Sequence, residues 1–584
     1  MKSQSSFLKT AAGKFHFHTN MTRQDYTYMG VLMFLFACMV FFRLGSFKAP
    51  ETTYTTSTGN RDIVLDLGSY KDVQSFSIFL GSLNARHLSL SAYNEVTGAW
   101  EVINGEAVVN SVFTWNEVVV NYNLRYLGIV ATDDTAMFNE LVVKAPDGSI
   151  IMPVNSAQYP ELFDEQDLFP SVNTYMTGTM FDEVYHGSTA YEFIHGLTTY
   201  ETTHPHFGKI LISLGIRIFG MTPFGWRFMC AVFGTLIIGV MYLFAKRLFN
   251  DTFVALATSA LLTFDCMHYN LSRIATIDIF AAFFILLMYY FMYEYIVKSK
   301  ESRELSEDTL TPLALCGISM AFGVATKWTG IYAGIGLGIL FIYHTLTHFL
   351  PAANRTLRES SSYSTKKQLG QLFLFCCVFF ILIPLIVYTL SFIPVVGYSE
   401  YKNLIDKAIS GSISMFRYHS QLVAEHYYSS PFYEWPIIWM PLLDANDMVN
   451  ATDVSAISCM GNPAIWWVGI FCEIFVLIRW IVKRDKKAGF LFVSYAAQYV
   501  PWMSISRITF IYHYFPSILF VILMMGYTID CIIKQFKWGK KAVVIYLTTA
   551  IIVFFLFFPV ISGLPVNKEW GLKLRWLKDW ILVL

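Results

Sequence analysis

The densest group of side chains able to do acid–base chemistry lies in residues 156–225. Asp182 and Glu183 stand side by side in the segment MFDEVYHG, and Glu201 and His204 follow in YETTHPHFGK. Adjacent carboxyl groups push each other's pKa values apart, so that one of them can accept a proton near neutral pH. An acidic dipeptide is also common on solvated surfaces. Its position just before a predicted membrane span, beside a proline-interrupted His/Lys segment, favours a catalytic role.

Three cations at the outer ends of predicted spans could bind a phosphate. Arg273 lies five residues before Asp278, and Lys327 and Arg507 lie at the ends of two other spans. Ionisable groups at a membrane are costly unless they are used, and fixed cations stabilise developing negative charge. The alternatives are an interfacial anchor for Arg273 and local ion pairs for Lys327 and Arg507. Asp278, like Glu201 and His204, is a candidate for the sugar or acceptor pocket.

A second polar region, residues 397–462, holds Tyr418, His419 and His426. These side chains could border a sugar or acceptor pocket, or they could pack a loop. The nine cysteines lack metal-ligand spacing, and no outer cluster of carboxylates and histidines has convincing ligand geometry. Neither a metal nor another cofactor is therefore expected.

The composition places these residues in a membrane protein. Hydrophobic residues make up 55% of the chain and charged residues 14%, whereas soluble domains carry about 25% charged residues. The 42 basic and 42 acidic residues cancel, which removes any case for a nucleic-acid surface built on bulk charge. The fold class expected is a polytopic α-helical membrane protein.

About eleven apolar segments approach the roughly 20 residues that a helix needs to cross a bilayer. The first, after a basic N-terminus, reads as an uncleaved signal anchor because no small-x-small cleavage site follows it. The predicted spans are 27–44, 226–245, 252–270, 277–296, 311–326, 329–348, 369–396, 463–482, 488–503, 509–533 and 541–562.

Basic residues predict the orientation of these spans. With the N-terminus in the cytoplasm, five basic connections fall on one side of an eleven-span arrangement. The large segments 47–225 and 397–462 then lie outside. The basic residues are Lys246, Arg247, Lys298, Lys300, Arg303, Arg355, Arg358, Lys366, Lys367, Lys483, Arg484, Lys486, Lys487, Lys534, Lys537, Lys540 and Lys541.

Residues 50–155 differ from the rest and predict an inserted all-β sandwich. Short strands are expected near 63–68, 76–81, 125–130 and 139–143, separated by turn signals. The order of these segments resembles the galactose-binding-like sandwich of discoidin domains. The resemblance implies a carbohydrate-binding or docking module; a spacer that orders the outer loop is the alternative.

Six ordered segments between about residue 176 and the C-terminus resemble the protein O-mannosyltransferase family, which has a multi-span fold of the GT-C type. They are FDEVYHG…YETTHPHFGK, SRIATID, TKWTGIY, YHSQLVAEHYYSSPFYEWP, GNPAIWW and QYVPWMSISRITFIYHYFP. The resemblance implies an inverting transfer of mannose from polyprenyl-phosphate mannose to Ser or Thr hydroxyls. By the same resemblance Asp182 is the general base, Glu183 shapes the site or the sugar pocket, and Arg273 is the first choice for the donor phosphate.

Two departures from the family pattern bear on the source and the acceptor. His206 replaces the second proline after the loop histidine, and Thr202 stands where eukaryotic members often carry an Asp. The large β-trefoil insert of the eukaryotic enzymes is also missing. These differences favour a bacterial-type enzyme at the cell membrane, with an undecaprenyl-like rather than a dolichyl carrier and an exported protein as acceptor.

Other functions and assemblies stay open at this point. The acceptor could be a wall polymer or glycolipid, since fold alone does not decide it. A transporter or glycan-binding receptor is less favoured, because no internal repeat is visible. Membrane lipids must surround the spans, the sandwich is a candidate glycan site, and a dimer is one candidate assembly.

The expected organisation follows the chain in eight parts. They are a cytoplasmic tail (1–26), the first transmembrane helix (27–46), the β-sandwich (50–155), a first outer loop with the acid pair (156–225), a transmembrane bundle (226–396), a late outer loop (397–462), a second transmembrane bundle (463–562) and an outer amphipathic tail (563–584).

Overall fold

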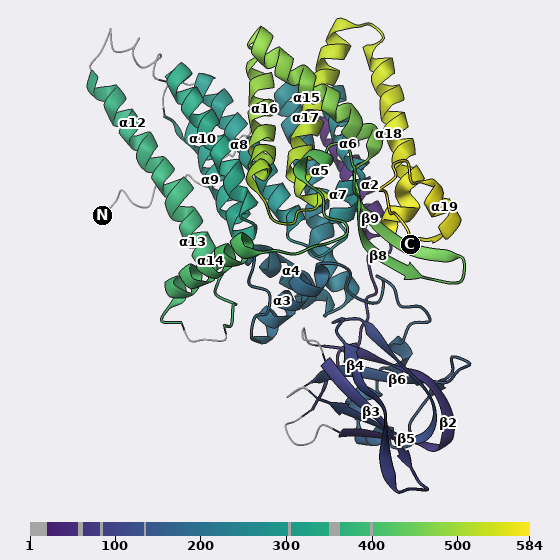
Figure 1. Ribbon diagram of the computed structural model, residues 1–584. Coiled ribbons are helices and arrows are strands. Elements are labelled where there is room, and N and C mark those ends of the chain that lie inside the picture. The colour runs from purple at the N-terminus through teal and green to yellow at the C-terminus, as the bar shows by residue number, and fades with distance from the viewer. Residues whose placement is uncertain are drawn as a thin grey trace.

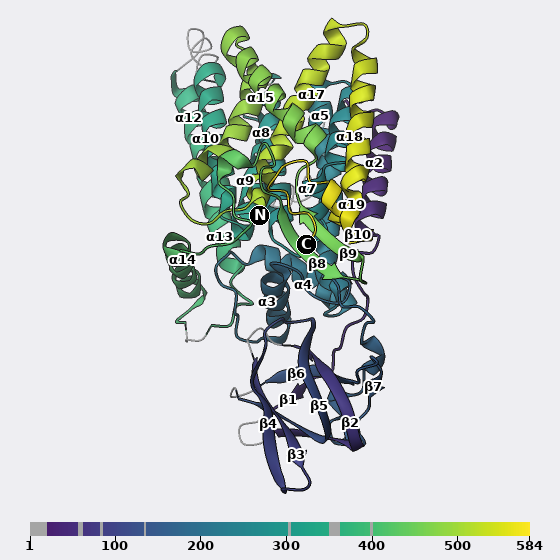
Figure 2. The ribbon, with the colours of Figure 1, turned by 45° about the vertical axis from the view of Figure 1, so that its right-hand side comes forward.

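The computed structural model describes residues 20–56, 62–81, 86–132, 136–301, 305–349, 362–397 and 401–584. Its two visible parts are a bundle of long helices and a β domain that lies beyond one end of the bundle (Figure 1). The same arrangement is seen after a rotation of 45° (Figure 2). Most of the predicted tail 1–26 lies outside the described residues.

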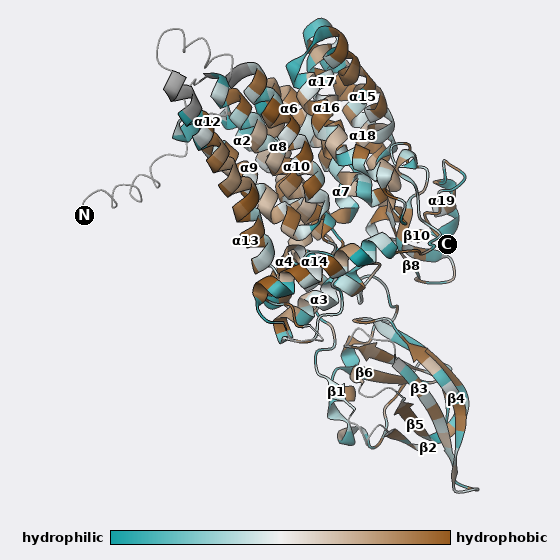
Figure 3. Cartoon of the chain, turned by 60° about the vertical axis from the view of Figure 1, so that its left-hand side comes forward, coloured by the Kyte–Doolittle hydropathy of each residue, from teal (hydrophilic) through white to brown (hydrophobic). Residues whose placement is uncertain are grey.

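Nine helices of the described residues are long and apolar enough to cross a membrane. Brown, hydrophobic residues cover the bundle along these helices (Figure 3). The helices are α2 (Arg23–Phe41), α5 (Pro223–Phe249), α8 (Asp278–Glu301), α9 (Glu307–Thr326), α10 (Thr329–His344), the continuous pair α12 (Ser362–Cys377) and α13 (Ile383–Leu390), α15 (Pro463–Lys483), α17 (Phe515–Gln535) and α18 (Gly539–Ser562). The expected polytopic helical fold is confirmed.

The two remaining predicted spans are shorter helices than a span requires. The segment 252–270 forms α6 (Thr252–Thr263) and α7 (Cys266–Leu271), and 488–503 forms α16 (Lys486–Tyr499). The side chain of Asp265 accepts a hydrogen bond from the backbone N–H of His268 at 3.0 Å and thereby starts α7 as a separate helix. Apolar composition alone could not reveal such a break, because Asp265 reads as one polar residue in an apolar run.

Three helices lie at the end of the bundle nearer the β domain. They are α3 (Glu183–His195), α4 (Phe207–Phe219) and α14 (Leu404–Gln421). Thr222 caps the start of α5 by accepting a hydrogen bond from the backbone N–H of Gly225, and Pro223 occupies its first turn. Because of this cap and the proline, α5 begins at Pro223, three residues before the start of the span predicted at 226–245.

The β domain consists of one antiparallel seven-stranded sheet with the order β1-β6-β2-β5-β3-β4, in which β7 also pairs with β6. Its presence confirms the expected β insert. The strands are β1 (Tyr54–Thr55), β2 (Asp62–Leu80), β3 (Arg86–Asn94), β4 (Ala99–Val109), β5 (Trp115–Ala131), β6 (Met137–Lys144) and β7 (Ile150–Ile151). Short 3₁₀ turns follow it.

The first two predicted strands, 63–68 and 76–81, belong to one long strand. β2 and β5 pair along their length, with register shifts between Asp66 and Lys71 and between Val73 and Ser75. At one end of this two-stranded ribbon β2 also pairs with β6, and at the other end β5 also pairs with β3. Bulges bend a strand and strengthen its twist. The bent β2–β5 ribbon therefore contributes strands to both the β6 side and the β3 side of the sheet. Glycan binding by this domain stays a prediction.

A second, three-stranded sheet joins the late loop to the C-terminal residues. Its order is β10 (Pro565–Asn567), β9 (Asp453–Cys459), β8 (Leu442–Met448), and the short helix α19 (Lys568–Lys573) follows. The amphipathic outer tail expected at 563–584 stays a prediction. Trp580 and Leu582 are fully buried and the backbone of β10 pairs with β9, whereas Trp570, Leu572 and Trp576 are exposed.

Candidate active site

Asp182 lies at the N-terminal end of α3, directly after a strained residue. Phe181 has φ +44°, a left-handed conformation that bulky residues rarely adopt. Its ring contacts those of Phe510 and Tyr512, with centroids 6.3 and 6.2 Å away. Among the described residues the Asp182 carboxylate has no hydrogen-bond partner, and it does not cap its own helix. Strain of this kind persists where the surroundings impose it, and it clusters at functional sites.

The surroundings of Asp182 favour its protonated form. Burial, with help from the negative charge of Asp278, raises the pKa of Asp182 to about 7, while the cation of Lys327 opposes the shift. A carboxyl group with a pKa near neutral can take up a proton and release it again under physiological conditions. The role of Asp182 as a general base stays a prediction, and these surroundings are compatible with it.

Glu183, its neighbour, is fully buried and makes contacts within the protein only. Its carboxylate receives hydrogen bonds from Nε and Nη2 of Arg227 at 2.7 and 2.6 Å. The indole N–H of Trp226 and the backbone N–H groups of Met180 and Ala275 also donate to it, at 3.2, 3.0 and 2.9 Å. Glu183 thus joins α3, α5 and the segment before α8, and it holds the turn that carries Asp182.

Lys327 and Asp278 form an ion pair beside Asp182. Nζ of Lys327 lies 2.7 Å from Oδ1 of Asp278 and 5.5 Å from the ring centroid of Tyr512. Asp278 is the first residue of α8, and Lys327 follows the last residue of α9. Two helix ends therefore bring a cation and a carboxylate next to the candidate base.

A cavity of about 640 Å³ opens next to Lys327. It is lined by apolar and aromatic side chains and by four basic residues, Lys327, Arg507, His204 and His419. The guanidinium of Arg507 makes one long hydrogen bond, 3.4 Å to the carbonyl of Ile508, and has no ion-pair partner among the described residues. Four residues from four separate segments of the sequence thus meet at one cavity, and one of their two cations is free.

Glu201 organises the loop beside this cavity. Its carboxylate forms a buried ion pair with Lys209, lies 3.3 Å from Nδ1 of His204 and accepts a hydrogen bond from the backbone N–H of Thr203 at 2.7 Å. Burial acts to raise the pKa of Glu201, but the charge of Lys209 and the contacts with His204 and His186 together hold that pKa well below its usual range. Glu201 is therefore a charged residue that holds the loop.

Both cavity histidines are held in their neutral form. Burial lowers the pKa of His204 and lowers the pKa of His419 to about 4. Nε2 of His419 lies 2.8 Å from the carbonyl oxygen of Thr203, and the two imidazole rings are 5.1 Å apart. His419 on α14 thereby ties the late loop to the first one. Neutral imidazoles can bind hydroxyl groups without adding charge.

Arg273 does not line this cavity, and its contact with the donor phosphate stays a prediction. Its side chain donates to the carbonyls of Phe42 and Arg43 at 2.7 and 2.8 Å and to the hydroxyl of Tyr269 at 2.8 Å. Only 3% of the residue is exposed. The carbonyls at the end of α2 have no partner within the helix, and Arg273 supplies one.

Tyr418 and His426 stand at the margin of the site. The Tyr418 ring is 5.3 Å from that of His419, and the His426 ring is 5.1 Å from that of Phe510. Both residues are exposed, and neither lines the cavity. A direct role in the pocket stays a prediction for both.

Asp278 also borders a narrow space that is lined by residues that the sequence did not single out. They are Asn270, Thr276, Asp444 and Tyr512. Nδ2 of Asn270 donates to Asp444 at 3.0 Å, while Oδ1 of Asn270 and Oγ1 of Thr276 are buried without a partner. Such atoms usually find a partner, so they are available to a bound hydroxyl group. Asn270 and Asp444 are 174 residues apart, and no spacing signal connects them.

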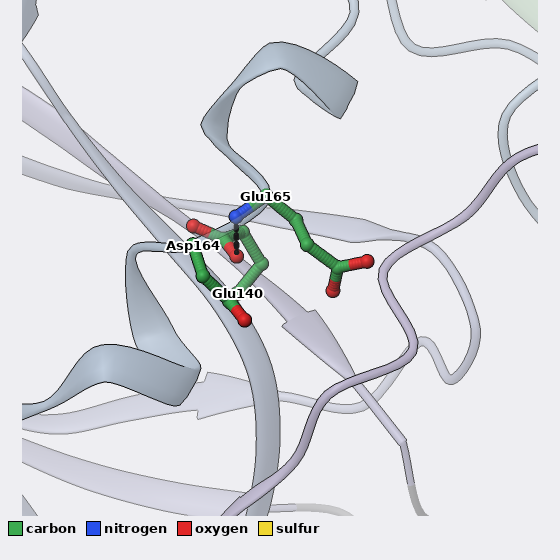
Figure 4. Close-up of side chains that lie close together, drawn as sticks. All are labelled: Glu140, Asp164 and Glu165. Carbon is green, nitrogen blue, oxygen red and sulfur yellow. Dashed lines mark hydrogen bonds between the residues drawn. The ribbon is translucent and has the colours of Figure 1, made fainter.

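Within the described residues, one group of carboxylates could hold a metal ion, and it belongs to the β domain and the turns after it. Glu140, Asp164 and Glu165 bring one oxygen each within 4.8 Å of one another (Figure 4). Glu140 accepts a hydrogen bond from the backbone N–H of Glu165 at 3.0 Å. Thr52 donates to Asp164 at 2.9 Å. These partners account for the cluster without an ion.

Two family models match most of the helical part of the chain. Residues 219–396 match "Dolichyl-phosphate-mannose-protein mannosyltransferase", and residues 404–580 match "C-terminal four TMM region of protein-O-mannosyltransferase". Together they include Asp278, Lys327, His419, Asp444 and Arg507. The acid pair and the loop with Glu201 precede both.

The chain is also similar to individual mannosyltransferases in sequence and in fold. A polyprenol-phosphate-mannose–protein mannosyltransferase of Mycolicibacterium smegmatis is 25% identical over 433 residues, which cover 65% of this chain and 81% of the relative. One of Corynebacterium glutamicum is 24% identical over 432 residues, with the same coverage. The fold resembles a Saccharomyces cerevisiae Pmt1-Pmt2 complex bound to the sugar donor, with a TM-score of 0.57, 16% identity and coverage of 69% of this chain and 89% of that one.

Proposed function

Because the chain belongs to the protein O-mannosyltransferase family, we propose that it transfers mannose from a polyprenyl-phosphate carrier to Ser or Thr hydroxyls of proteins. The observation that carries the proposal is the arrangement around Asp182. A carboxyl group with a pKa of about 7 stands beside the Lys327–Asp278 ion pair, which borders a cavity with an unpaired arginine.

The cavity is suited to the phosphate of the donor. Lys327 and Arg507 line it, and Arg507 has no anionic partner among the described residues. When the bond between mannose and phosphate breaks, the phosphate gains a negative charge. Fixed cations in a partly dehydrated cavity stabilise that charge without further reorganisation. We therefore assign the donor phosphate to Lys327 and Arg507.

Asp182 serves as the general base in this proposal. The oxygen of the acceptor hydroxyl attacks C1 of mannose, and the C1–O bond to the phosphate breaks with its electron pair staying on the phosphate. The hydroxyl proton goes to the Asp182 carboxylate. Attack from the side opposite the leaving phosphate inverts the configuration at C1. General-base catalysis of this kind typically contributes about 10²- to 10⁴-fold to the rate.

Polar groups near the base can bind the sugar. Asn270 and Thr276 each have a buried oxygen without a partner, and Asp278 and Asp444 border the same narrow space. The space has a volume of about 10 Å³, enough for about one water-sized group, so a single hydroxyl group of a hexose could enter it and bind these atoms. His204 and His419, both neutral, line the cavity on the side of Lys327. We propose that no metal is required, because Lys327 and Arg507 already supply positive charge to the phosphate.

The proposed orientation has the N-terminus in the cytoplasm and both the β domain and the site outside. Positive residues in cytoplasmic connections support it. Lys246, Lys300, Lys483 and Lys534 all end helices that run away from the site. Arg303, Arg355 and Arg358 lie outside the described residues. An outward-facing site matches a polyprenyl-phosphate carrier in the outer leaflet and an exported protein as acceptor.

A transfer assay tests the proposal. Purified full-length protein is supplied with radiolabelled polyprenyl-phosphate mannose and an exported Ser/Thr-rich protein. We expect label on the protein acceptor with the wild type and with Asp167→Asn, an exposed control, and none with Asp182→Asn. Label on glycan or lipid alone would replace the protein acceptor with a wall polymer or glycolipid. Folded wild-type protein without any donor cleavage would overturn the enzyme function itself.

A further inference from the structure

A second large cavity lies at the end of the bundle opposite the β domain. It has a volume of about 550 Å³ and lies between α8, α10, α15 and α16. Its walls are mostly apolar and include Tyr293, Val297, Leu340, Phe490 and Val493. Along α8 it is roughly 33 Å from Asp278, at 1.5 Å per residue. It is therefore separate from the candidate active site.

Cations surround the mouth of this cavity. Lys300 at the end of α8, Arg484 at the end of α15 and Lys486 at the start of α16 all line it. None of the three has an ion-pair partner among the described residues. The neighbouring acid, Asp485, is engaged elsewhere, since it accepts a hydrogen bond from the hydroxyl of Tyr527 at 2.6 Å and pairs with Arg479 at 3.5 Å.

Lys487 differs from the other three cations. Its Nζ donates to the carbonyl of Leu248 at 2.6 Å, so part of its hydrogen-bonding capacity is used within the protein. Within the part of the chain that the structure describes, Lys300, Arg484 and Lys486 make no such contact. Like charges repel when they share one cavity mouth, and an anion between them would relieve that repulsion. Three positive charges around an apolar cavity therefore indicate a ligand with an anionic head and an apolar tail.

Arg484 also has an unfavourable backbone conformation. Its φ is +56°, at the left-handed position that ends α15. Glycine or asparagine usually occupies this position, because the β-carbon of other residues is strained there. An arginine at this place keeps a positive charge beside the cavity in spite of the strain.

We propose that this cavity binds a membrane phospholipid with an anionic headgroup. The phosphate lies among Lys300, Arg484 and Lys486, and an acyl chain packs against Val297, Leu340 and the other apolar walls. The cavity lies at the ends of membrane-spanning helices, which is the depth of lipid headgroups. Each cation near an anionic headgroup favours its binding, and a zwitterionic headgroup would add a positive charge where three are already present.

Trp480 provides a direct readout, because it lines the cavity and is 36% exposed. Full-length protein is reconstituted in phosphatidylcholine vesicles that contain increasing fractions of phosphatidylglycerol with brominated acyl chains, which quench nearby tryptophans. Subtracting the signal of Trp480→Phe isolates this residue among the 14 tryptophans. We expect quenching of Trp480 to saturate at a low fraction of brominated phosphatidylglycerol and to need far more brominated phosphatidylcholine.

Charge variants then test the assignment. Lys300→Gln with Lys486→Gln should weaken the phosphatidylglycerol response about 30-fold, since each basic residue contributes a factor of about five. Lys483→Gln with Lys537→Gln removes the same charge from helix ends outside the cavity and should leave the response unchanged. Equal quenching by the two lipids, equal weakening by both variant pairs, or displacement of the lipid by inorganic phosphate would overturn the proposal.

Discussion

Both ends of the helical bundle place cations beside a cavity, but the neighbours of those cations differ. Near the β domain, Lys327 is paired with Asp278 at 2.7 Å and lies within the electrostatic reach of Asp182. At the opposite end, Lys300 and Lys486 border an apolar cavity, and neither is paired with an acid among the described residues. Positive charge alone makes a place for an anion to bind. A carboxyl group with a raised pKa next to that charge makes chemistry possible.

The strongest test of this comparison is Asp182→Asn. The amide cannot accept the hydroxyl proton, so we expect turnover to fall about 10²- to 10⁴-fold. The structure should change little, because the Asp182 carboxylate has no hydrogen-bond partner among the described residues. Single-turnover transfer and thermal unfolding, measured on the same preparation, check both expectations. Unchanged turnover would remove Asp182 from the proposed mechanism.

Glu183→Ala tests the neighbouring acid, which has a structural role. The substitution leaves Arg227 buried without its carboxylate, and breaking a buried pair typically costs about 3–5 kcal/mol of stability. We expect a clear drop in the thermal midpoint together with the loss of activity. Asp167→Ala, which removes an exposed acid outside the bundle, is the control. A stable but inactive Glu183 variant would show that this carboxylate takes part in the chemistry.

Arg507→Ala compares the two ends of the bundle directly. We expect the KM for the lipid-linked donor to rise about 10-fold or more, since a charge-assisted contact to phosphate is worth about 1.5–3 kcal/mol. Arg484→Ala removes the same charge at the opposite end and should leave that KM unchanged. The comparison fails if both substitutions weaken the donor equally.

The pH dependence should give the smallest effect. Catalysis needs the Asp182 carboxylate, so activity should rise with pH and reach half of its maximum near pH 7, where the pKa lies. Stability should change in the opposite direction. The folded carboxyl group holds its proton up to about pH 7, whereas an unfolded Asp loses it near 3.9, so this group favours folding at low pH and less as pH rises. Asp182→Asn should flatten both profiles.

The sequence predicted those parts of the site that depend on contiguous residues. Asp182, Glu201 and His204 stand in two neighbouring motifs, and the family resemblance points to them without knowledge of the fold. Asp278, Lys327 and Arg507 lie at helix ends, and apolar periodicity locates helix ends to within a few residues. The helical membrane fold and the β insert follow from composition and turn signals.

The remaining features depend on contacts between distant segments. Arg273 donates to the carbonyls of Phe42 and Arg43, about 230 residues earlier in the chain, and nothing near Arg273 in the sequence indicates that contact. The same holds for Asn270 and Asp444. Glu183 and Asp182 are adjacent, yet only the position of Arg227 on α5 shows that one of them is buried in an ion pair.

The strand β10 has a consequence for the order in which the protein is assembled. It pairs with β9, and β9 pairs with β8, the strand that carries Asp444. A protein leaves the ribosome from its N-terminus onward, so β10 emerges only after α18 has been made. The sheet around Asp444 is therefore completed at the last stage of synthesis. Until then β9 is paired along one edge only, and the sheet that carries Asp444 lacks its third strand.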